Sequence, residues 1–393
     1  MPLKTTSTNH IPAFLAMAMM NATREVEAQG HDVVHLEVGQ PSAPPPAAVN
    51  NALAAALNKG ATHGYSVAFG EAPLRDRIAA HYEDWYGVRP DPRAIAITPG
   101  SSVGFALAFL GAFDRGDKIA MVTPGYPAYR NLMVALGIEP MLLPARANEG
   151  WRPQLAALEE SGEMPDGLLI ASPANPTGVV MDNDEVAAIC AWCDKHGVRL
   201  IMDEIYHGLN FGARPTSALC HSRNAIVVNS FSKYFCMTGW RVGWAVLPDD
   251  LIEICERLGQ NMYISAPRPM QEGAIAAFDS YDELDAHVLN YRDNLELLTR
   301  ELPDAFLGDM APAGGAFYLY ADISNLSKTP INSLEFCQAM LRDAHVACTS
   351  GLDFDPEQGA QHLRLSFAGS HADMKEASRR INSWLPHYLR NLG

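Results

Sequence analysis

The sequence predicts an α/β fold, in which a large domain with a mostly parallel, doubly wound sheet flanked by helices is joined to a smaller α+β domain. Three observations support this prediction. Short apolar segments rich in β-branched residues recur along the chain, each followed by turn residues and a helical pattern. These segments are continuously apolar rather than alternating, which is typical of strands covered on both faces. After about residue 290 the pattern changes to long helices alternating with short strands, at residues 315–323 and 362–368.

The first expected element is an amphipathic helix in the apolar run of residues 11–20, which is too short to span a bilayer and lacks a small-residue cleavage pattern. The strands of the large sheet are expected within residues 94–100, 118–125, 167–176, 199–206, 225–233 and 242–248. We therefore expect a large domain over residues 46–290. Residues 1–45, which include a lid segment, and residues 291–393 would form the small domain.

Composition and charge exclude several classes of function. Of the 393 residues, 48% are hydrophobic, and the formal net charge of −16 opposes binding to the phosphates of nucleic acids. Seven cysteines, an odd number in a long chain, fit a reducing compartment. Cys190 and Cys193 form a CxxC pair, but the surrounding pattern is helical and no second ligand pair follows, so we expect core residues. The sequence predicts a cytoplasmic protein that binds no nucleic acid, membrane or metal.

The most informative segment is SFSKYFCMTGWRVGW, residues 230–244, which places Lys233 among hydroxyl, aromatic and glycine residues. Burial disfavours the charged form of a lysine, so a buried amine of this kind can act as a nucleophile towards an aldehyde. Ser230 lies three residues before the lysine and Arg241 eight after it. A serine hydroxyl and an arginine fork can bind phosphate together, which predicts an anion site beside the amine.

A second phosphate element is expected after the first strand of the large sheet. Gly100, Ser101 and Ser102 open a helix there, and free N–H groups at a helix start suit an anion together with serine hydroxyls. Ligands of doubly wound sheets sit at the carboxyl ends of the strands. The polar residues that close the predicted strands should therefore converge on one rim, and they are Ser101, Asn175, Asp203, Tyr206, Ser230 and Lys233.

These motifs together resemble those of fold type I pyridoxal-5′-phosphate enzymes of the class I/II aminotransferase family, which share the aspartate aminotransferase fold. The most specific pieces are SPANPTG, DEIY, and SFSK followed by MTGWRVG, in that order, and the resemblance runs from residue 36 to residue 370. It implies an aminotransferase that moves an amino group from an amino acid to a 2-oxo acid by a ping-pong mechanism. It also implies a homodimer with shared active sites.

The resemblance implies a role for each matching residue. Lys233 resembles the lysine that joins covalently to the cofactor aldehyde and later moves a proton, and Asp203 resembles the carboxylate beneath the pyridine nitrogen. A carboxylate there keeps the nitrogen protonated, so that electrons from the broken Cα–H bond can enter the ring. Asn175 and Tyr206 resemble the pair that holds the phenolic oxygen, and Asn175 also faces the substrate carboxylate. The implied phosphate ligands are Ser101, Ser102, Ser230 and Arg241.

Other matches concern the ring, the substrate and the second subunit. Tyr126 resembles the aromatic residue that stacks on the pyridine ring, with Tyr129 as a competing candidate. Arg364 resembles the arginine that binds the substrate α-carboxylate, a bidentate contact that a lysine would imitate poorly. Gly39 resembles the glycine whose backbone faces the same carboxylate. Tyr65 resembles the residue that reaches the phosphate of the neighbouring subunit.

The sequence departs from family members that act on dicarboxylic amino acids. The positions that carry a cation in those members correspond to Ser102 and, more loosely, Gln260, and neither is basic. Arg268 and His207 are nearby alternatives that we expect to be structural. The apolar, methionine-rich segment at residues 11–20 favours a neutral or hydrophobic substrate side chain.

Two other functions stay open. A β-eliminating C–S lyase, or a related fold type I enzyme, would carry the same motifs because the cofactor supplies the electron sink in all of them. A non-catalytic cofactor-binding sensor, like the aminotransferase-like half of some transcription regulators, is a remote alternative. The substrate-site glycine already lies at position 39, which leaves no room for a preceding DNA-binding domain, and the acidic net charge opposes this reading.

Overall fold

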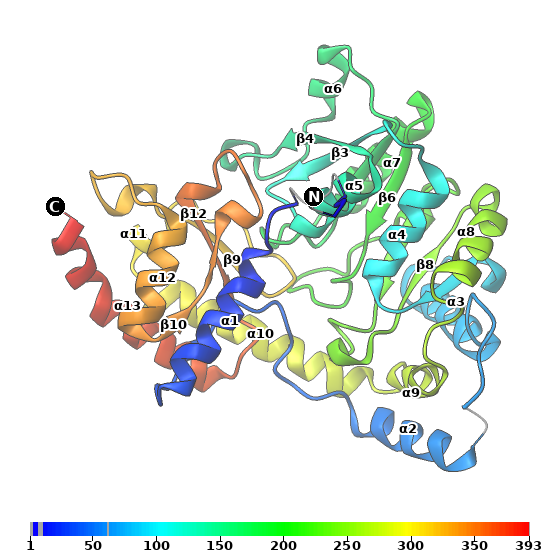
Figure 1. Cartoon of the computed structure of the whole chain (residues 1–393), viewed down its shortest axis with the longest axis horizontal. Helices are drawn as coiled ribbons and strands as arrows, with labels where there is room; N and C mark the ends of the chain where they lie inside the picture. The colour runs from blue at the N-terminus through cyan, green and yellow to red at the C-terminus, as the bar shows by residue number, and fades with distance from the viewer. Residues whose placement is uncertain (1–2, 7–10, 61–62, 393) are drawn as a thin grey trace.

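A computed structural model describes residues 3–6, 11–60 and 63–392. Its large sheet has the order β2-β8-β7-β6-β5-β3-β4 (Figure 1). β8 pairs antiparallel with both β2 and β7, and the other neighbours pair parallel. The predicted α/β class and the mostly parallel sheet are therefore confirmed. The strands are β2 (Ile95–Thr98), β3 (Lys118–Thr123), β4 (Glu139–Pro144), β5 (Gly167–Ala171), β6 (Arg199–Asp203), β7 (Ile226–Ser230) and β8 (Gly243–Val246).

Helices cover both faces of this sheet. Accordingly, alternate residues of a strand belong to two different hydrophobic cores. Ile119 and Met121 of β3 pack in one cluster with Phe109, whereas Ala120 belongs to the other. The helices on the first face are α4 (Ser101–Ala112), α5 (Pro127–Leu136) and α8 (Asp249–Met262). The helices on the second face are α3 (Ala72–Tyr86), α7 (Asn183–His196) and α9 (Arg268–Ala277). The remaining helices before the C-terminal part are α1 (Leu15–Ala28), α2 (Ala47–Lys59) and α6 (Leu155–Ser161).

The sequence analysis missed one strand of the large sheet, β4. Pro140 and Pro144 lie within it, and all but one of its residues are at least partly exposed. Proline lacks an N–H group for the ladder and is therefore confined to edge strands or bulges. β4 is such an edge strand, because it pairs only with β3. An edge strand of this composition carries neither the continuous apolar run nor the alternation by which the other strands were found.

The C-terminal part contains a three-stranded antiparallel sheet, β11-β12-β9. The N-terminal segment joins this part, since β1 (Val34–His35) pairs in parallel with β10 (Val346–Ala347). The other strands of the C-terminal part are β9 (Tyr318–Asp322), β11 (Thr349–Ser350) and β12 (His362–Ser366). Its helices are α11 (Asp304–Leu307), α12 (Ser333–Ala344) and α13 (His371–Leu392).

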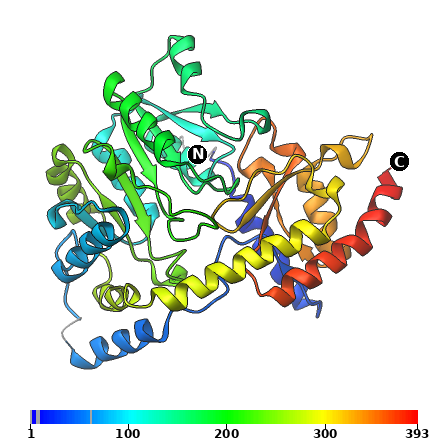
Figure 2. The ribbon, with the colours of Figure 1, turned by 180° about the vertical axis from the view of Figure 1, so that it is seen from behind.

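The expected domain limit at residue 290 lies inside one long helix, α10 (Tyr281–Glu301). Figures 1 and 2 show this helix, in yellow, running from the large sheet to the C-terminal part. The division into residues 46–290 and the two flanking pieces stays a prediction. Residues 1–2, 7–10 and 393 of the expected small domain, and residues 61–62 of the large one, lie outside the described chain.

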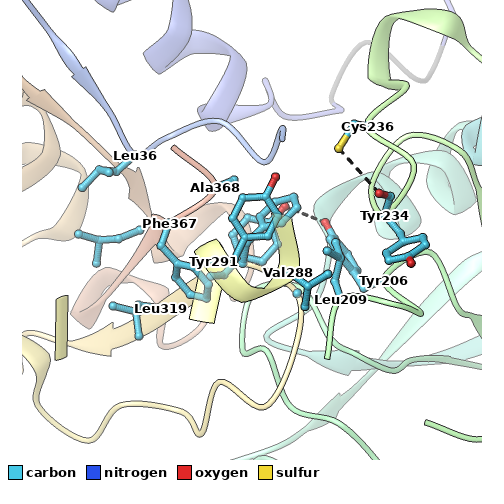
Figure 3. Packing of buried hydrophobic residues seen from close by; sticks show 14 of the residues in the cluster. Leu36, Tyr206, Leu209, Tyr234, Cys236, Val288, Tyr291, Leu319, Phe367 and Ala368 are labelled. Carbon is cyan, nitrogen blue, oxygen red and sulfur yellow. Dashed lines mark hydrogen bonds between the residues drawn. The ribbon is translucent and has the colours of Figure 1, made fainter. Parts of the chain in front are cut away.

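One hydrophobic core connects the two parts (Figure 3). Tyr206 and Leu209, which follow β6 of the large sheet, belong to the same cluster of buried residues as Leu319 of β9 and Phe367 after β12. Tyr291, on the side of α10, lies between them in the picture. Burial of apolar surface across the junction stabilises the position of the small sheet relative to the large one. The relative position of the two sheets matters because the candidate active site takes residues from both of them.

The structure also bears on what the sequence led us to expect of membrane helices and cysteines. Among the residues that the structure describes, no helix is both long and apolar enough to cross a lipid bilayer. Cys190 and Cys193 are buried on α7, and all seven cysteines are free thiols. Within the described residues no group of three or more His, Cys, Asp or Glu side chains is arranged to hold a metal ion. The CxxC pair is therefore part of the core, as predicted.

Candidate active site

A cavity of about 440 Å³ opens at the carboxyl ends of the large-sheet strands. Those strand ends carry Asp203 at the close of β6 and Asn175 after β5. The small sheet contributes Arg364 from β12 and Tyr318 from β9. Of the residues singled out in the sequence, those that line this cavity are Gly39, Ser101, Ser102, Tyr126, Tyr129, Asn175, Asp203, Tyr206, Lys233, Arg241 and Arg364.

Lys233 lies on the loop after β7 with its amine inside the cavity. Its Nζ donates a hydrogen bond to the carbonyl of Gly39 at 2.5 Å. Burial and the positive charge of Arg364 lower the pKa of Lys233 to about 7, while the negative charge of Asp203 opposes this shift. Much of the amine is therefore uncharged at neutral pH and able to attack a carbonyl carbon.

Asp203 is almost fully buried and is held by two donors. Its Oδ1 accepts from the backbone N–H of Ile205 at 3.0 Å, and its Oδ2 accepts a short hydrogen bond from the Tyr129 hydroxyl. Burial raises the pKa of Asp203 to about 6, although both hydrogen bonds and the charge of Lys233 lower it. Tyr129 thus has its hydroxyl committed to Asp203. Tyr126 meets Tyr129 edge to face at 5.3 Å, and both rings line the cavity.

Tyr206 forms a buried pair with Tyr318, their hydroxyls lying 2.7 Å apart. The Tyr318 hydroxyl also packs against the backbone of Gly39, where an added Cβ would overlap it. Gly39 is therefore required for this close approach. Its backbone faces Lys233 on one side and Tyr318 on the other, so the segment after β1 forms a fixed wall of the cavity.

Arg364 is anchored deep in the cavity with 2% of its surface exposed. Its guanidinium donates to Asn175 Oδ1 at 3.1 Å and to the carbonyl of Glu37 at 2.7 Å, and it lies 4.4 Å from the centre of the Tyr318 ring. Its Nε has no hydrogen-bond partner within the described residues. A buried donor without a partner costs stability unless a ligand pairs with it, so this end of the cavity is built for an anion such as a carboxylate.

The opposite end of the cavity has the donors of a phosphate site. α4 begins at Ser101 after Gly100, and no side chain caps its free N–H groups. Gly100 has a φ of +78°, and a Cβ there would overlap the Arg241 guanidinium. Arg241 has a φ of +55°, a conformation that costs a non-glycine residue of the order of 1 kcal/mol and that recurs at functional sites. The backbone brings the arginine fork, serine hydroxyls and a helix start together.

Two residues to which the sequence analysis gave a cofactor-binding role do not line the cavity. The Ser230 hydroxyl is buried, donating to the carbonyl of Val242 at 3.0 Å and lying 2.9 Å from the Ser232 hydroxyl. Ser232 lines the cavity instead, with its hydroxyl 3.5 Å from Arg241 Nη1. Tyr65 is 80% exposed on the protein surface and stands away from the cavity of its own chain. The roles predicted for Ser230 and Tyr65 stay predictions.

The rest of the cavity is largely apolar. Beyond Asp203, Lys233, Arg241 and Arg364, none of the described residues around it carries a charge. His207 is buried beside the Tyr86 hydroxyl at 2.7 Å, and Arg268 pairs with Glu71 at 3.1 Å. Neither lines the cavity, as the sequence analysis expected. The apolar side chains on its wall are Phe14, Ala16, Met17, Val38, Phe105, Ala128, Leu132 and Ile205.

Sequence reasoning missed the residues that hold the reactive groups in place. The second tyrosine of the YPAY segment supports Asp203, the carbonyl of Glu37 holds Arg364, and Tyr318 supports Tyr206. Only the position of Tyr129, three residues after Tyr126 in the same segment, offered a signal in the sequence.

His35 and Glu37 stabilise the segment that leads to Gly39. The Glu37 carboxylate is fully buried and accepts from His35 Nδ1 at 2.8 Å, while His35 Nε2 lies 3.1 Å from Glu27. The hydrogen bond to Glu37 raises the pKa of His35 to about 9, against the opposing effect of desolvation, with both carboxylates adding to the rise. The proton on His35 therefore favours the folded state.

Raising the pH should weaken the fold through this pair. The contribution of His35 is complete below about pH 6.5, its unfolded pKa, and is lost as the pH rises through about 9. Because the side chain is 42% exposed, we expect a loss of only about 1 kcal/mol. Urea unfolding at several pH values should show wild type and His35→Gln converging at high pH, with His387→Gln as the control. A difference that stays constant across this range would contradict the assignment.

The chain is similar to known proteins over nearly its whole length. The model of the family Aminotransferase class I and II matches residues 31–381. A valine–pyruvate aminotransferase of Mycobacterium tuberculosis is 46% identical over 380 residues, 96% of this chain and 97% of that protein. A (5-formylfuran-3-yl)methyl phosphate transaminase of Methanocaldococcus jannaschii is 31% identical over 379 residues, 95% and 97% of the two chains. The crystal structure of an aminotransferase from Mycobacterium tuberculosis superposes with a TM-score of 0.94 at 44% identity, covering 98% of this chain and 100% of that one.

Proposed function

The chain belongs to the aminotransferase class I and II family, and from this premise we propose that it uses pyridoxal 5′-phosphate to move an amino group from a neutral amino acid to a 2-oxo acid. The chain is an aminotransferase, with the fold type I of aspartate aminotransferase. One observation carries the proposal of cofactor and substrate: a poised lysine, a buried aspartate and an anchored arginine meet in one cavity.

The donor set of the cavity fits this cofactor. A phosphate would be held by the start of α4, by Ser101 and Ser232, and by Arg241, whose guanidinium occupies the space that Gly100 leaves free. Asp203 would hold the ring nitrogen, and Asn175 and Tyr206 the phenolic oxygen. When bound, pyridoxal 5′-phosphate supplies an aldehyde that combines with amines and an aromatic ring that takes up the electrons of the Cα–H bond.

Each of three residues in the cavity would have its own role in the reaction. Arg364 binds the α-carboxylate of the amino acid, because its Nε is buried without a partner and its fork matches a carboxylate. Lys233, with a pKa of about 7, can take a proton from the substrate Cα and return it nearby, since this value lies close to the working pH. Asp203 holds a proton at the ring nitrogen through its negative charge. The ordered walls exclude water from these groups.

The substrate side chain is proposed to be neutral. Once Arg241 binds phosphate, Arg364 binds the α-carboxylate and Lys233 is engaged with the cofactor, no further arginine or lysine remains among the described residues around the cavity to pair with a second carboxylate. The apolar wall from α1 and α5 favours an aliphatic side chain instead. The name of the Mycobacterium tuberculosis relative, a valine–pyruvate aminotransferase, supports the same substrate class.

A homodimer and a cytoplasmic location complete the proposal. Tyr65, Val67 and Ile264 expose 80%, 61% and 48% of their surface, and the Ser66 N–H donates to the Ser265 hydroxyl at 3.3 Å, so the two segments adjoin. An exposed apolar patch of this kind suits a second copy of the chain, to which Tyr65 would reach. The free thiols support a reducing compartment.

A panel of amino acids tests the proposed reaction. Each amino acid is mixed in a single turnover with the cofactor-loaded protein, and both the conversion of the cofactor to its amine form and the 2-oxo acid released are measured. Alanine and valine should convert the cofactor faster than aspartate, and pyruvate or 2-oxoglutarate should restore it. Pyruvate and ammonia released from cystathionine without any acceptor would instead support a C–S lyase. No conversion with any amino acid would contradict transamination.

A further inference from the structure

The start of α1 forms one wall of the cavity. Phe14, Ala16 and Met17 all line it, and the Phe14 ring meets Tyr126 edge to face at 5.8 Å. Figure 1 shows α1, in blue, between the C-terminal part and the large sheet. Because this wall is apolar and adjoins the ring proposed to stack on the cofactor, its position determines how much room is left for a substrate side chain.

α1 does not cap its own N-terminus. The residue at the N-cap position is Phe14, whose side chain offers no hydrogen bond, and the first turn contains no acidic residue. The cap comes from the other end of the chain: Asp353 accepts from the Leu15 N–H at 3.1 Å through one carboxylate oxygen and from the Ala16 N–H at 3.0 Å through the other. A carboxylate that receives two N–H groups at a helix start also interacts favourably with the helix dipole.

The cap is part of a connected structure around the cavity. Asp353 ends a short 3₁₀ helix, η7 (Gly351–Asp353), in the C-terminal part and is 4% exposed. The next residue, Phe354, places its ring 4.7 Å from the Arg364 guanidinium, and its carbonyl accepts from the Gly125 N–H at 3.1 Å. Two consecutive residues therefore contact the wall on α1, the proposed carboxylate-binding arginine and the loop that carries Tyr126.

We propose that Asp353 is a positioning residue for substrate specificity: by fixing the start of α1 over the cavity, it restricts the enzyme to amino acids with small side chains. This inference rests on the proposed function. With the cap in place, Phe14 and Met17 are held on the wall of the cavity. Without it, the first turn of α1 frays, because its N–H groups lose their acceptor. Small substrates then lose a contact, and larger ones gain room.

The test compares Asp353→Asn and Asp353→Ala with wild type as cofactor-loaded proteins. Two quantities are measured: kcat/KM for alanine, valine and phenylalanine, and the hydrogen exchange rate of the α1 amides. We expect the preference for valine over phenylalanine to fall about tenfold in Asp353→Ala, the effect of losing one helix cap, and by less in Asp353→Asn, whose amide oxygen can still accept one N–H group. Exchange at the start of α1 should become faster. Phe14→Ala, which enlarges the same wall directly, should shift the preference without accelerating exchange along the rest of α1.

Asp182→Asn is the matched control. Asp182 caps α7 with its carboxylate, outside the cavity, so this variant should change neither the preference nor the exchange of α1. Equal losses for all three amino acids in Asp353→Ala, or unchanged exchange of the α1 amides in that variant, would overturn the role of Asp353. Both results presuppose an active wild type. A wild type that transaminates no amino acid would refute the proposed function itself, so the two failures are distinguishable.

Discussion

Replacing Lys233 by alanine should abolish transamination, lowering kcat/KM by at least about 10⁴-fold, the upper range for losing a general acid–base group. Under the proposed function the variant loses two roles at once, because the same amine would attack the cofactor aldehyde and move the proton at the substrate Cα. The cavity itself should survive, since the side chain makes one hydrogen bond, to the carbonyl of Gly39. Borohydride reduction of wild type followed by peptide mapping should place the cofactor on Lys233, and the variant should take up no label.

The exposed Lys195 on α7 provides the matched control for this variant. Lys195→Ala should keep full activity and the same label on Lys233. Added methylamine offers a second check, because a small external amine can enter the space left by the lysine side chain and restore part of the proton transfer. A label found on another lysine, or an alanine variant with near wild-type turnover, would contradict the role assigned to Lys233.

The sequence could predict the site because its reactive groups end strands. Asp203 closes β6 and Asn175 follows β5, and parallel strands point their carboxyl ends to one rim, so convergence follows from topology alone. Lys233 and Arg241 are close in sequence and need only a short loop to meet. These placements depend on local pattern and on the chirality of parallel connections, both of which are readable from residue order.

The groups that support the site could not be predicted in this way. Asp353 caps α1 from 338 residues away along the chain, and the carbonyl of Glu37 receives Arg364 from 327 residues away. Any buried aspartate or carbonyl could serve such a purpose, so residue type alone does not identify the partner. Residue type also did not show which of Ser230 and Ser232 faces the cavity. The sequence places both beside Lys233, and only the packing of the loop decides which hydroxyl faces the cavity.

Asp203→Asn should lower kcat by about 10²- to 10³-fold, the usual effect of removing one preorganised charge from an active site. The amide retains the shape of the carboxylate and can still accept from the Ile205 N–H, so folding should be little affected. It cannot supply the negative charge that holds a proton on the ring nitrogen. Each unit by which the pKa of that nitrogen falls weakens its protonation by about 1.4 kcal/mol. The loss should therefore persist at every pH in a stopped-flow measurement of the half-reaction.

Tyr129→Phe tests the hydrogen bond to Asp203 while leaving the carboxylate itself in place. The Tyr129 hydroxyl lowers the pKa of Asp203, so removing it should raise that pKa further above about 6. The carboxylate then ionises only at higher pH. Activity should fall about tenfold near neutral pH, matching one lost hydrogen bond to a charged group, and recover as the pH rises. Tyr126→Phe, which leaves this bond intact, serves as the control. If Tyr129→Phe lost the same activity at every pH, its hydroxyl would act by some route other than the charge of Asp203.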